Sequence, residues 1–258
     1  MRERLADTST AMPESTDGGM NLIIDIGNTR AKLTVFDGEE PIASTVTTHD
    51  LTGVEELAAK HNCRRGIVST TAGLTGEAER KMAALPFPVL RMRGETPVPL
   101  TVTYRSRHTL GTDRLAAAVG ARTLMPEGEL LVVDAGTCVT IDFVDADNNY
   151  RGGNISPGLE MRLRAMHEGT ARLPEVSSEG EAPEVGFDTV TALRSGAVRG
   201  LRMEIEGYIR HFRQKYPDVS VFLTGGDAKK LGISEEFIIF APDFIVPRGL
   251  NTILRYNQ

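Results

Sequence analysis

The chain has 258 residues, of which 40% are hydrophobic and 25% are charged. This composition is typical of a globular protein with one large or two smaller domains. Because the formal net charge is −6 and no apolar run reaches membrane-spanning length, we expect no nucleic-acid partner and no membrane partner. Cys63 and Cys138 lack metal-ligand spacing, which indicates free thiols in a reducing compartment such as the cytoplasm.

Residues 1–19 are polar and contain no apolar segment of the kind that a secretory signal requires. Their Ser, Thr, Asp and Gly content predicts a disordered tail. We therefore expect a chain that begins at Met20 to keep full activity.

Alternating apolar residues and turn residues predict an α/β order in the first half of the chain. Three consecutive antiparallel strands are followed by helix, strand, helix and strand. The expected ranges, in chain order, are 21–27, 31–37, 41–48, 51–61, 64–70, 73–85 and 86–92. A loop with several prolines and basic residues follows over 93–108, and an Ala-rich helix over 109–125.

The pattern then begins again. Strand, turn and strand are expected over 129–145, and a third strand over 149–158 ends on a Gly-rich turn. The remaining elements are helices over 159–169 and 189–215, strands over 219–226 and 236–241, and a last helix over 249–257. Strands and helices repeated in this order predict two α/β lobes.

The repeat is also visible residue by residue. "LIIDIGNTRAKLTVFD" and "LLVVDAGTCVTIDFVD" both place Asp, Gly and Thr at the end of an apolar strand, so that Asp25 matches Asp134 and Gly27 matches Gly136. Two such copies favour duplication over chance. We expect an N-terminal lobe over 20–108 and a C-terminal lobe over 109–258, with the last helix a candidate to pack back on the first lobe.

These turns have the chemistry of phosphate-binding loops. Glycine lets the backbone approach an oxyanion, and main-chain N–H groups and a Thr hydroxyl donate to it. The adjacent carboxylate repels phosphate directly, but it can hold a Mg²⁺ ion that neutralises the phosphates. A single turn of this type is more often an ordinary tight hairpin. Likewise, Gly225 and Gly226 in "FLTGGDA" are compatible with a nucleoside contact or with a simple strand-to-helix turn.

Six segments in the same order resemble the type III pantothenate kinases, a family of the actin, sugar-kinase and heat-shock-chaperone ATPase superfamily. They are "DIGNTRAK" (25–32), "GTDR" (111–114), "DAGTCVT" (134–140), "GGNISPG" (152–158), "TARLP" (170–174) and "TGG" (224–226). The resemblance extends from about residue 21 to the C terminus. It implies two duplicated RNase H-like lobes, as in actin-like ATPases, with a nucleotide cleft between them.

The resemblance also implies an activity, which is transfer of the ATP γ-phosphate to pantothenate in the first step of coenzyme A biosynthesis. The implied cofactors are Mg²⁺ with ATP and a monovalent cation, K⁺ or NH₄⁺, which Asp134 helps to hold. Asp113 is the implied proton acceptor. The implied ATP contacts are Asp25, Ile26, Gly27, Asn28, Thr29, Arg30, Ala31, Lys32 and Thr137. The implied substrate contacts are Tyr104, Gly111, Thr112, Asp113, Arg114 and Thr189, the last offered by the partner subunit of a homodimer.

Elementary chemistry leaves alternatives open at these positions. Asp113 begins a predicted helix, where a carboxylate is commonly present because it interacts favourably with the helix dipole. Arg114 has the planar fork that suits a substrate carboxylate, but a surface role is equally common for such a residue. Thr112 stands where the family commonly has Ala. Two rival functions also remain, another small-molecule kinase of the superfamily and a catalytically inactive regulator of the transcriptional accessory factor type.

Overall fold

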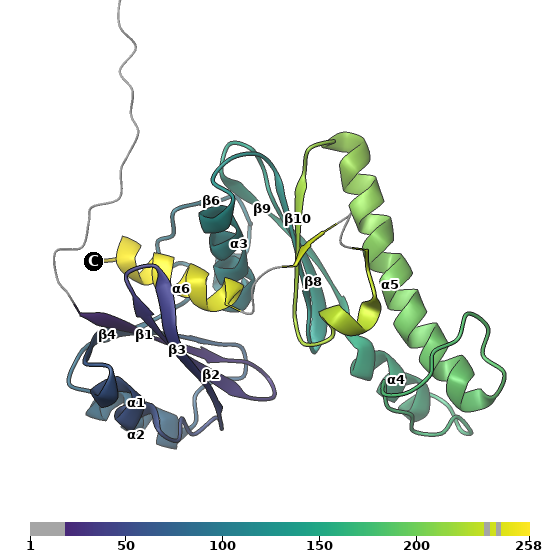
Figure 1. Cartoon of the computed structure of the whole chain (residues 1–258), viewed down its shortest axis with the longest axis horizontal. Helices are drawn as coiled ribbons and strands as arrows, with labels where there is room; N and C mark the ends of the chain where they lie inside the picture. The colour runs from purple at the N-terminus through teal and green to yellow at the C-terminus, as the bar shows by residue number, and fades with distance from the viewer. Residues whose placement is uncertain (1–18, 235–237, 241–243) are drawn as a thin grey trace, which may run out of the picture.

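The structure is a computed structural model, and it describes residues 19–234, 238–240 and 244–258. The predicted tail therefore lies almost wholly outside the described residues, as do parts of the strand predicted over 236–241. Two mixed β-sheets lie on either side of a central pair of helices, and further helices cover the outer face of each sheet (Figure 1). No helix within the described residues is both long and apolar enough to cross a membrane.

The first sheet is built from the N-terminal third of the chain. Its strands are β1 (Met20–Ile26), β2 (Ala31–Asp37), β3 (Glu40–Thr47), β4 (Cys63–Thr70) and β5 (Val89–Arg91). Their order is β3-β2-β1-β4-β5, with β1–β2 and β2–β3 antiparallel and the other pairs parallel. The helices α1 (Val54–Lys60) and α2 (Gly76–Ala84) pack their buried side chains on its outer face.

The second sheet repeats this arrangement. Its strands are β6 (Thr101–Val102), β7 (Leu130–Ala135), β8 (Cys138–Val144), β9 (Asn149–Pro157), β10 (Ser220–Thr224) and β11 (Ile239–Phe240). Their order is β11-β10-β7-β8-β9-β6, again with an antiparallel run of three strands in β7, β8 and β9. The helices α4 (Leu159–Glu168) and α5 (Thr189–Lys215) cover the outer face. A 3-10 turn over Ala228–Leu231, after β10, packs on the same face.

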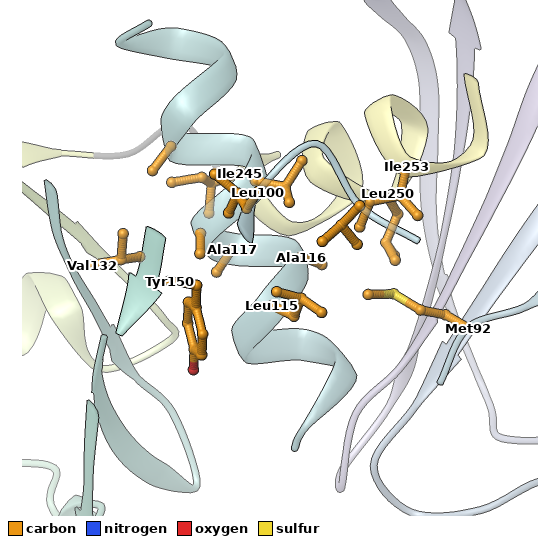
Figure 2. Packing of buried hydrophobic residues seen from close by; sticks show 14 of the residues in the cluster. Met92, Leu100, Leu115, Ala116, Ala117, Val132, Tyr150, Ile245, Leu250 and Ile253 are labelled. Carbon is orange, nitrogen blue, oxygen red and sulfur yellow. The ribbon is translucent and has the colours of Figure 1, made fainter. Parts of the chain in front are cut away.

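Two helices fill the space between the sheets. They are α3 (Thr112–Leu124) and α6 (Ile245–Tyr256). Their backbones are in close contact, because a Cβ on Gly120 would overlap the carbonyl of Ile245 and a Cβ on Gly249 would overlap that of Ala116. Figure 2 shows the apolar cluster around them, to which both sheets contribute. The two lobes therefore share one continuous core through this helix pair.

The last helix also makes polar contacts with the first sheet. Asn251 accepts a hydrogen bond of 2.7 Å from the side chain of Asn21 and donates one of 2.8 Å to the carbonyl of Gly38. Arg255 forms an ion pair with Glu39 at 2.7 Å. The C-terminal end of the chain is thus attached to the first lobe. The second sheet, in turn, includes residues before 109, since β6 pairs with β9.

The predicted elements agree well with the observed ones. The helix predicted over 189–215 has these bounds in the structure. Three observed elements differ from the predicted ones, and the first two differences have local causes. The first helix begins only at Val54, after Gly53 with a left-handed φ of 83°. The last begins at Ile245 rather than at 249, because Pro247 is compatible with a first helical turn. The loop over 93–108 contains β6 and a 3-10 turn over Arg107–Thr109.

Candidate active site

Strand alternation directs two carboxylates toward the central helices. Ile23 on β1 and Val132 on β7 both belong to the cluster around α3 and α6. Side chains two residues apart on a strand point to the same face. Asp25 and Asp134 therefore face the space between the sheets, each at the C-terminal end of its strand.

Both predicted phosphate turns open onto one cavity of about 370 Å³. Residues from the first turn, the second turn, the start of α3 and the loop before it line this cavity. They are Gly27, Asn28, Thr71, Tyr104, Thr109, Gly111, Asp113, Arg114, Asp134, Gly136, Thr137, Cys138, Thr140 and Ile155. The structure thus brings the "DIGN", "GTDR" and "DAGT" segments together, although more than 100 residues separate the first from the last of them in the chain.

A second cavity of about 460 Å³ continues from the first. Gly136 and Thr137 line both of them, and the second cavity adds Thr29, Gly226 and Asp227. Gly226 of "TGG" and the two turns therefore line adjoining spaces. A still larger cavity, of about 520 Å³, lies along α5 and is lined by Arg202, Glu206, Ile209, Arg210, Arg213, Gln214 and Ser234. It includes none of the predicted site residues.

Three carboxyl groups are coupled electrostatically in this cleft. Burial raises the pKa of Asp25 to about 6, and the nearby Asp113 raises it further against the lowering effect of Lys32. Burial likewise raises the pKa of Asp134 to about 7, with added repulsion from Asp113, Asp25 and Asp142. The pKa of Asp113 is raised chiefly by burial, although its carboxylate accepts a hydrogen bond of 2.8 Å from the backbone N–H of Arg114. The cleft therefore holds more negative charge than it can neutralise.

This charge suits a bound cation whose remaining ligands are not protein groups. Within the described residues, no cluster of three or more His, Cys, Asp or Glu side chains could hold a metal ion alone. Mg²⁺ is commonly bound by one or two carboxylates together with waters and phosphate oxygens. Asp25 and Asp134 fit this pattern, because burial first and neighbouring carboxylates second raise their pKa values, and a bound cation would oppose both effects.

The second turn is supported by two glycines of the predicted motifs. Gly158 donates its N–H to the carbonyl of Thr137 at 3.1 Å, and a Cβ at this position would overlap the carbonyls of Gly136 and Thr137. Gly225 has a φ of 99°, and a Cβ there would overlap the backbone of Ala135. The "SPG" and "TGG" segments thus pack directly against the second turn, and only glycine fits at these two points.

Arg114 is held by a buried ion pair. Its Nε and Nη2 donate to the two carboxylate oxygens of Asp142 at 3.1 and 2.6 Å. The hydroxyl of Tyr150 donates to the same carboxylate at 2.7 Å. The guanidinium also lies over the ring of Tyr104, 5.8 Å from its centroid. Burial lowers the pKa of Arg114, but the carboxylate of Asp142 outweighs it and keeps this pKa above its ordinary value.

The glycine pair of "YRGG" makes room for these groups. A Cβ on Gly152, whose φ is 97°, would lie 2.8 Å from the ring of Tyr104. A Cβ on Gly153 would lie 2.6 Å from a carboxylate oxygen of Asp142, its neighbour across the β8–β9 ladder. The motif is therefore needed to place Tyr104 and Asp142 beside Arg114.

Several predicted residues do not line either cavity. Ile26 and Ala31 are fully buried in the core of the first lobe, so only their backbones are available to a ligand. Thr112 is also buried, and its hydroxyl lies 2.8 Å from that of Ser69 in a hydrogen bond between α3 and β4. Lys32 lies over the ring of Phe244 at 4.9 Å. Arg30 is exposed at the rim of the first turn.

Thr189, the predicted contribution of a partner subunit, begins α5 at an exposed position. The carboxylate of Asp188 caps this helix by accepting a hydrogen bond of 2.7 Å from the N–H of Thr191. The helix start is therefore fixed, while the hydroxyl of Thr189 is on the surface of this subunit and outside its two cleft cavities.

Sequence reasoning missed other residues of the site. The cavity also includes Thr71, Thr109, Thr140 and Ile155, and the ion pair adds Asp142 and Tyr150. For two of these residues, the sequence pattern could have indicated a role in the site. Thr140 ends the "DAGTCVT" segment, and Asp142 is a carboxylate two positions further along the same strand, on the same face. Tyr150 gave no such signal, since tyrosine is common in strands.

Comparison with known proteins identifies the family. A family model described as type III pantothenate kinase matches residues 21–211. The chain belongs to the type III pantothenate kinase family. The enzyme of this name from Phocaeicola vulgatus is 47% identical over 240 residues, which cover 93% of this chain and 99% of the relative. The enzyme from Bacteroides fragilis is 46% identical, and the match covers 93% of this chain and 99% of the relative. The enzyme from Porphyromonas gingivalis is 42% identical, and the match covers 92% of this chain and 98% of the relative.

Solved structures place the fold among the actin-like ATPases, as predicted. A Campylobacter jejuni protein described as a Baf family transcriptional activator has a TM-score of 0.58 and 19% identity, covering 92% of this chain and 98% of its own. A polyphosphate/ATP-glucomannokinase from Arthrobacter has a TM-score of 0.50 and 14% identity, covering 93% and 100%. At these identities the likeness shows the fold alone, so the first structure gives no support to a regulatory function.

Proposed function

We propose that this type III pantothenate kinase transfers the γ-phosphoryl group of ATP to the primary hydroxyl of pantothenate, with Asp113 as the group that orients and deprotonates this hydroxyl. The observation that carries this assignment is the single cavity lined by both phosphate turns and by Asp113. An acceptor hydroxyl bound at Asp113 lies in the same space as a phosphate bound at the turns, which is the arrangement that in-line transfer requires.

The environment of Asp113 supports its role as proton acceptor. Burial raises its pKa, which makes the carboxylate a stronger base than an exposed aspartate. The backbone N–H of Arg114 holds one carboxylate oxygen at 2.8 Å and leaves the other to accept a proton. Because phosphoryl transfer has a loose transition state, late proton removal by such a base is sufficient.

We assign the ATP contacts to residues 25–32 and to Thr137. The backbone N–H groups of Gly27 and Gly136 are each used within their own turn, by the carbonyls of Arg30 and Cys138 at 3.1 Å. The side chains and the other amides of the two turns are then the groups that bind phosphate oxygens. For the second cavity, with Gly226 and Asp227, we propose the nucleoside end of ATP.

Kinases of this family use ATP with a divalent metal, and we propose Mg²⁺ held through Asp25 and phosphate oxygens. Bound there, it would neutralise the phosphate charge that develops during transfer. For Asp134 we propose a role in holding a monovalent cation, K⁺ or NH₄⁺. The support is its strongly raised pKa, to which burial contributes most and which no cation among the described residues opposes. ATP is supplied in the cytoplasm, and we assign the reaction to this compartment.

We also propose a homodimer in which Thr189 contacts the pantothenate bound by the partner subunit. Large apolar side chains surround Thr189 in the sequence and are exposed on this subunit, with Phe187 72% and Val185 79% accessible. Clustered exposure of this kind marks an interface between proteins. Analytical ultracentrifugation tests the dimer, and Phe187→Glu is expected to produce monomers.

The deciding experiment measures ADP release with and without pantothenate, in the presence of Mg²⁺ and of K⁺, NH₄⁺ or neither. We expect release that depends on pantothenate. Absence of turnover under all these conditions would favour the regulatory alternative, and a panel of other alcohols tests the rival small-molecule kinase. Asp113→Asn is expected to lower kcat by at least about 100-fold. ATP affinity, measured by calorimetry, should stay near that of the wild type, and near-normal turnover would refute the role of Asp113.

A further inference from the structure

The ion pair beside the cleft has a two-point geometry. Arg114 and Asp142 are both buried, and the guanidinium uses its Nε and Nη2 on the two oxygens of one carboxylate. A two-point contact between a planar fork and a carboxylate fixes the direction of the guanidinium as well as its position. Nη1 is the nitrogen that Asp142 does not engage.

The carboxylate itself is fixed from other sides. The Tyr150 hydroxyl donates to the oxygen that also accepts from Nη2, and the ring of Tyr150 is fully buried in the apolar cluster between the sheets (Figure 2). Burial raises the pKa of Tyr150, so its hydroxyl stays protonated and remains a donor at neutral pH. Gly153 lies directly against Asp142, since a Cβ at this position would be only 2.6 Å from the carboxylate oxygen that accepts from Nη2 and from Tyr150. Two residues outside the cavity thus determine the orientation of one residue that lines it.

Because of these contacts, the side chain of Arg114 lacks the conformational freedom of a surface arginine. A mobile guanidinium in this cleft could turn toward the buried carboxyl group of Asp134. Asp142 instead fixes it at the cavity wall, where its charge also lowers the pKa of Asp113. Tyr104 covers one face of the guanidinium and meets the ring of Tyr150 edge to face at 6.4 Å.

We propose that Asp142 and Tyr150 are positioning residues that hold Arg114 with its Nη1 side toward the cavity, where it receives the carboxylate of the substrate. The proposal rests on the proposed function, since pantothenate has one carboxylate at the end opposite its reactive hydroxyl. It assigns selectivity for an acidic substrate to the Arg114–Asp142–Tyr150 group rather than to Arg114 alone.

The test compares pantothenate with pantothenol, in which an alcohol replaces the carboxylate. Asp142→Asn is expected to raise KM for pantothenate by about tenfold or more, because it weakens both charge-assisted hydrogen bonds. KM for pantothenol and KM for ATP should change by less than about twofold. Tyr150→Phe removes one hydrogen bond to Asp142 and is expected to raise KM for pantothenate by about threefold, in the same selective way.

A double-mutant cycle separates positioning from a general structural role. In an Arg114→Lys background the Asp142→Asn change should have little further effect on pantothenate, because lysine has no fork to orient. Asp145→Asn, at the end of the same strand and outside the cavity, is the matched control and should leave both KM values unchanged. If Asp142→Asn fails to fold, Tyr150→Phe is measured instead, in the wild-type and the Arg114→Lys backgrounds.

The outcomes are distinct. Equal losses toward pantothenate, pantothenol and ATP would overturn the proposal, and so would tighter pantothenate binding in Asp142→Asn or full additivity with Arg114→Lys. If the wild type does not phosphorylate pantothenate, the proposed function fails. Calorimetric binding of pantothenate and pantothenol to the same variants, with a non-hydrolysable ATP analogue, then decides the role of Asp142 by itself.

Discussion

In the first lobe Asp25 lies opposite Lys32 on the neighbouring strand, whereas in the second lobe the equivalent Asp134 lies opposite Thr140. The same motif has thus acquired a cation on one side of the cleft and a neutral hydroxyl on the other. Lys32 lowers the pKa of Asp25, which remains at about 6, while that of Asp134 rises to about 7. The second carboxylate has the greater need of an external cation.

The two turns also differ in how they are supported. A Cβ would have only ordinary contacts at Gly27 and at its equivalent Gly136, 3.6 and 3.4 Å from the nearest atom. The second turn differs because Gly158 and Gly225 pack against it and neither has room for a side chain. The first turn thus has a cation opposite its carboxylate, and the second turn has two closely packed glycines.

The largest expected effect comes from Asp134. Asp134→Asn should lower kcat by about 100- to 1,000-fold and remove activation by K⁺ or NH₄⁺, because the group proposed to hold this cation loses its charge. Steady-state rates over a monovalent cation series check this. Asp25→Asn is the matched change in the first lobe, and it should lower turnover while any remaining activity still responds to K⁺. Equal loss of the K⁺ response in both variants would remove the distinction between the turns.

Glycine substitution tests the difference in support. Gly225→Ala should lower the free energy of unfolding by about 2–3 kcal/mol, because its φ is left-handed and the new Cβ would overlap Ala135. Denaturant unfolding measures this effect. Gly226→Ala, with no atom within 4 Å of the new Cβ, and Gly27→Ala in the first turn should each change it by less than about 0.5 kcal/mol. A large loss in Gly27→Ala would show that the first turn is equally rigid.

The pH dependence of stability sharpens the electrostatic comparison. A carboxyl group with a raised pKa in the folded state stabilises the protein fully below its unfolded pKa near 4, and this contribution is lost as the pH rises to the folded pKa. For Asp134 the loss extends to about pH 7 and for Asp25 to about pH 6.

In the absence of ligands and added divalent metal, both Asp→Asn variants should therefore be stabilised relative to the wild type at pH 8, and much less at pH 4. The gain should be greater for Asp134→Asn, because the pKa of Asp134 is raised further than that of Asp25. Urea unfolding at pH 4, 6 and 8 provides the measurement. A greater gain for Asp25→Asn would reverse the proposed order of the two sites.

The smallest effect is expected from Lys32→Gln. Without this cation the pKa of Asp25 should rise toward that of Asp134, so the stabilisation given by Asp25→Asn at pH 8 should increase by less than about 1 kcal/mol. The same unfolding series in the Lys32→Gln background measures it. Lys60→Gln, at the exposed end of α1, is the control and should have no such effect. An unchanged gain in the Lys32→Gln background would show that Lys32 does not set the difference.

Much of the cleft was predictable from local patterns. Each phosphate turn is encoded within a few residues, since apolar alternation defines the strands and the Gly and Thr define the turn. The duplication then predicted that Asp25 and Asp134 have equivalent places. In the structure both interact electrostatically with Asp113, although only Asp134 lines the same cavity as Asp113. Which of the matching residues can contact a ligand with their side chains was not predictable to the same degree. Ile26, Ala31 and Thr112 belong to matching motifs, yet their side chains are buried, because a strand or helix next to a cleft must still contribute to the core.

The sequence by itself determined the two-lobed fold, the two turns and the carboxylates at their ends, because these depend on neighbours within one hairpin or one helix start. Only the tertiary structure decided what surrounds them. Asp142 and Tyr150 reach Arg114 because β8 pairs with β9, with a register shift between Phe143 and Val144, and α3 lies across their face. Gly152 makes room for the ring of Tyr104, and Gly153 makes room for the carbonyl of Ile141 and the carboxylate of Asp142. Such contacts depend on the packing of distant elements, which no local pattern records.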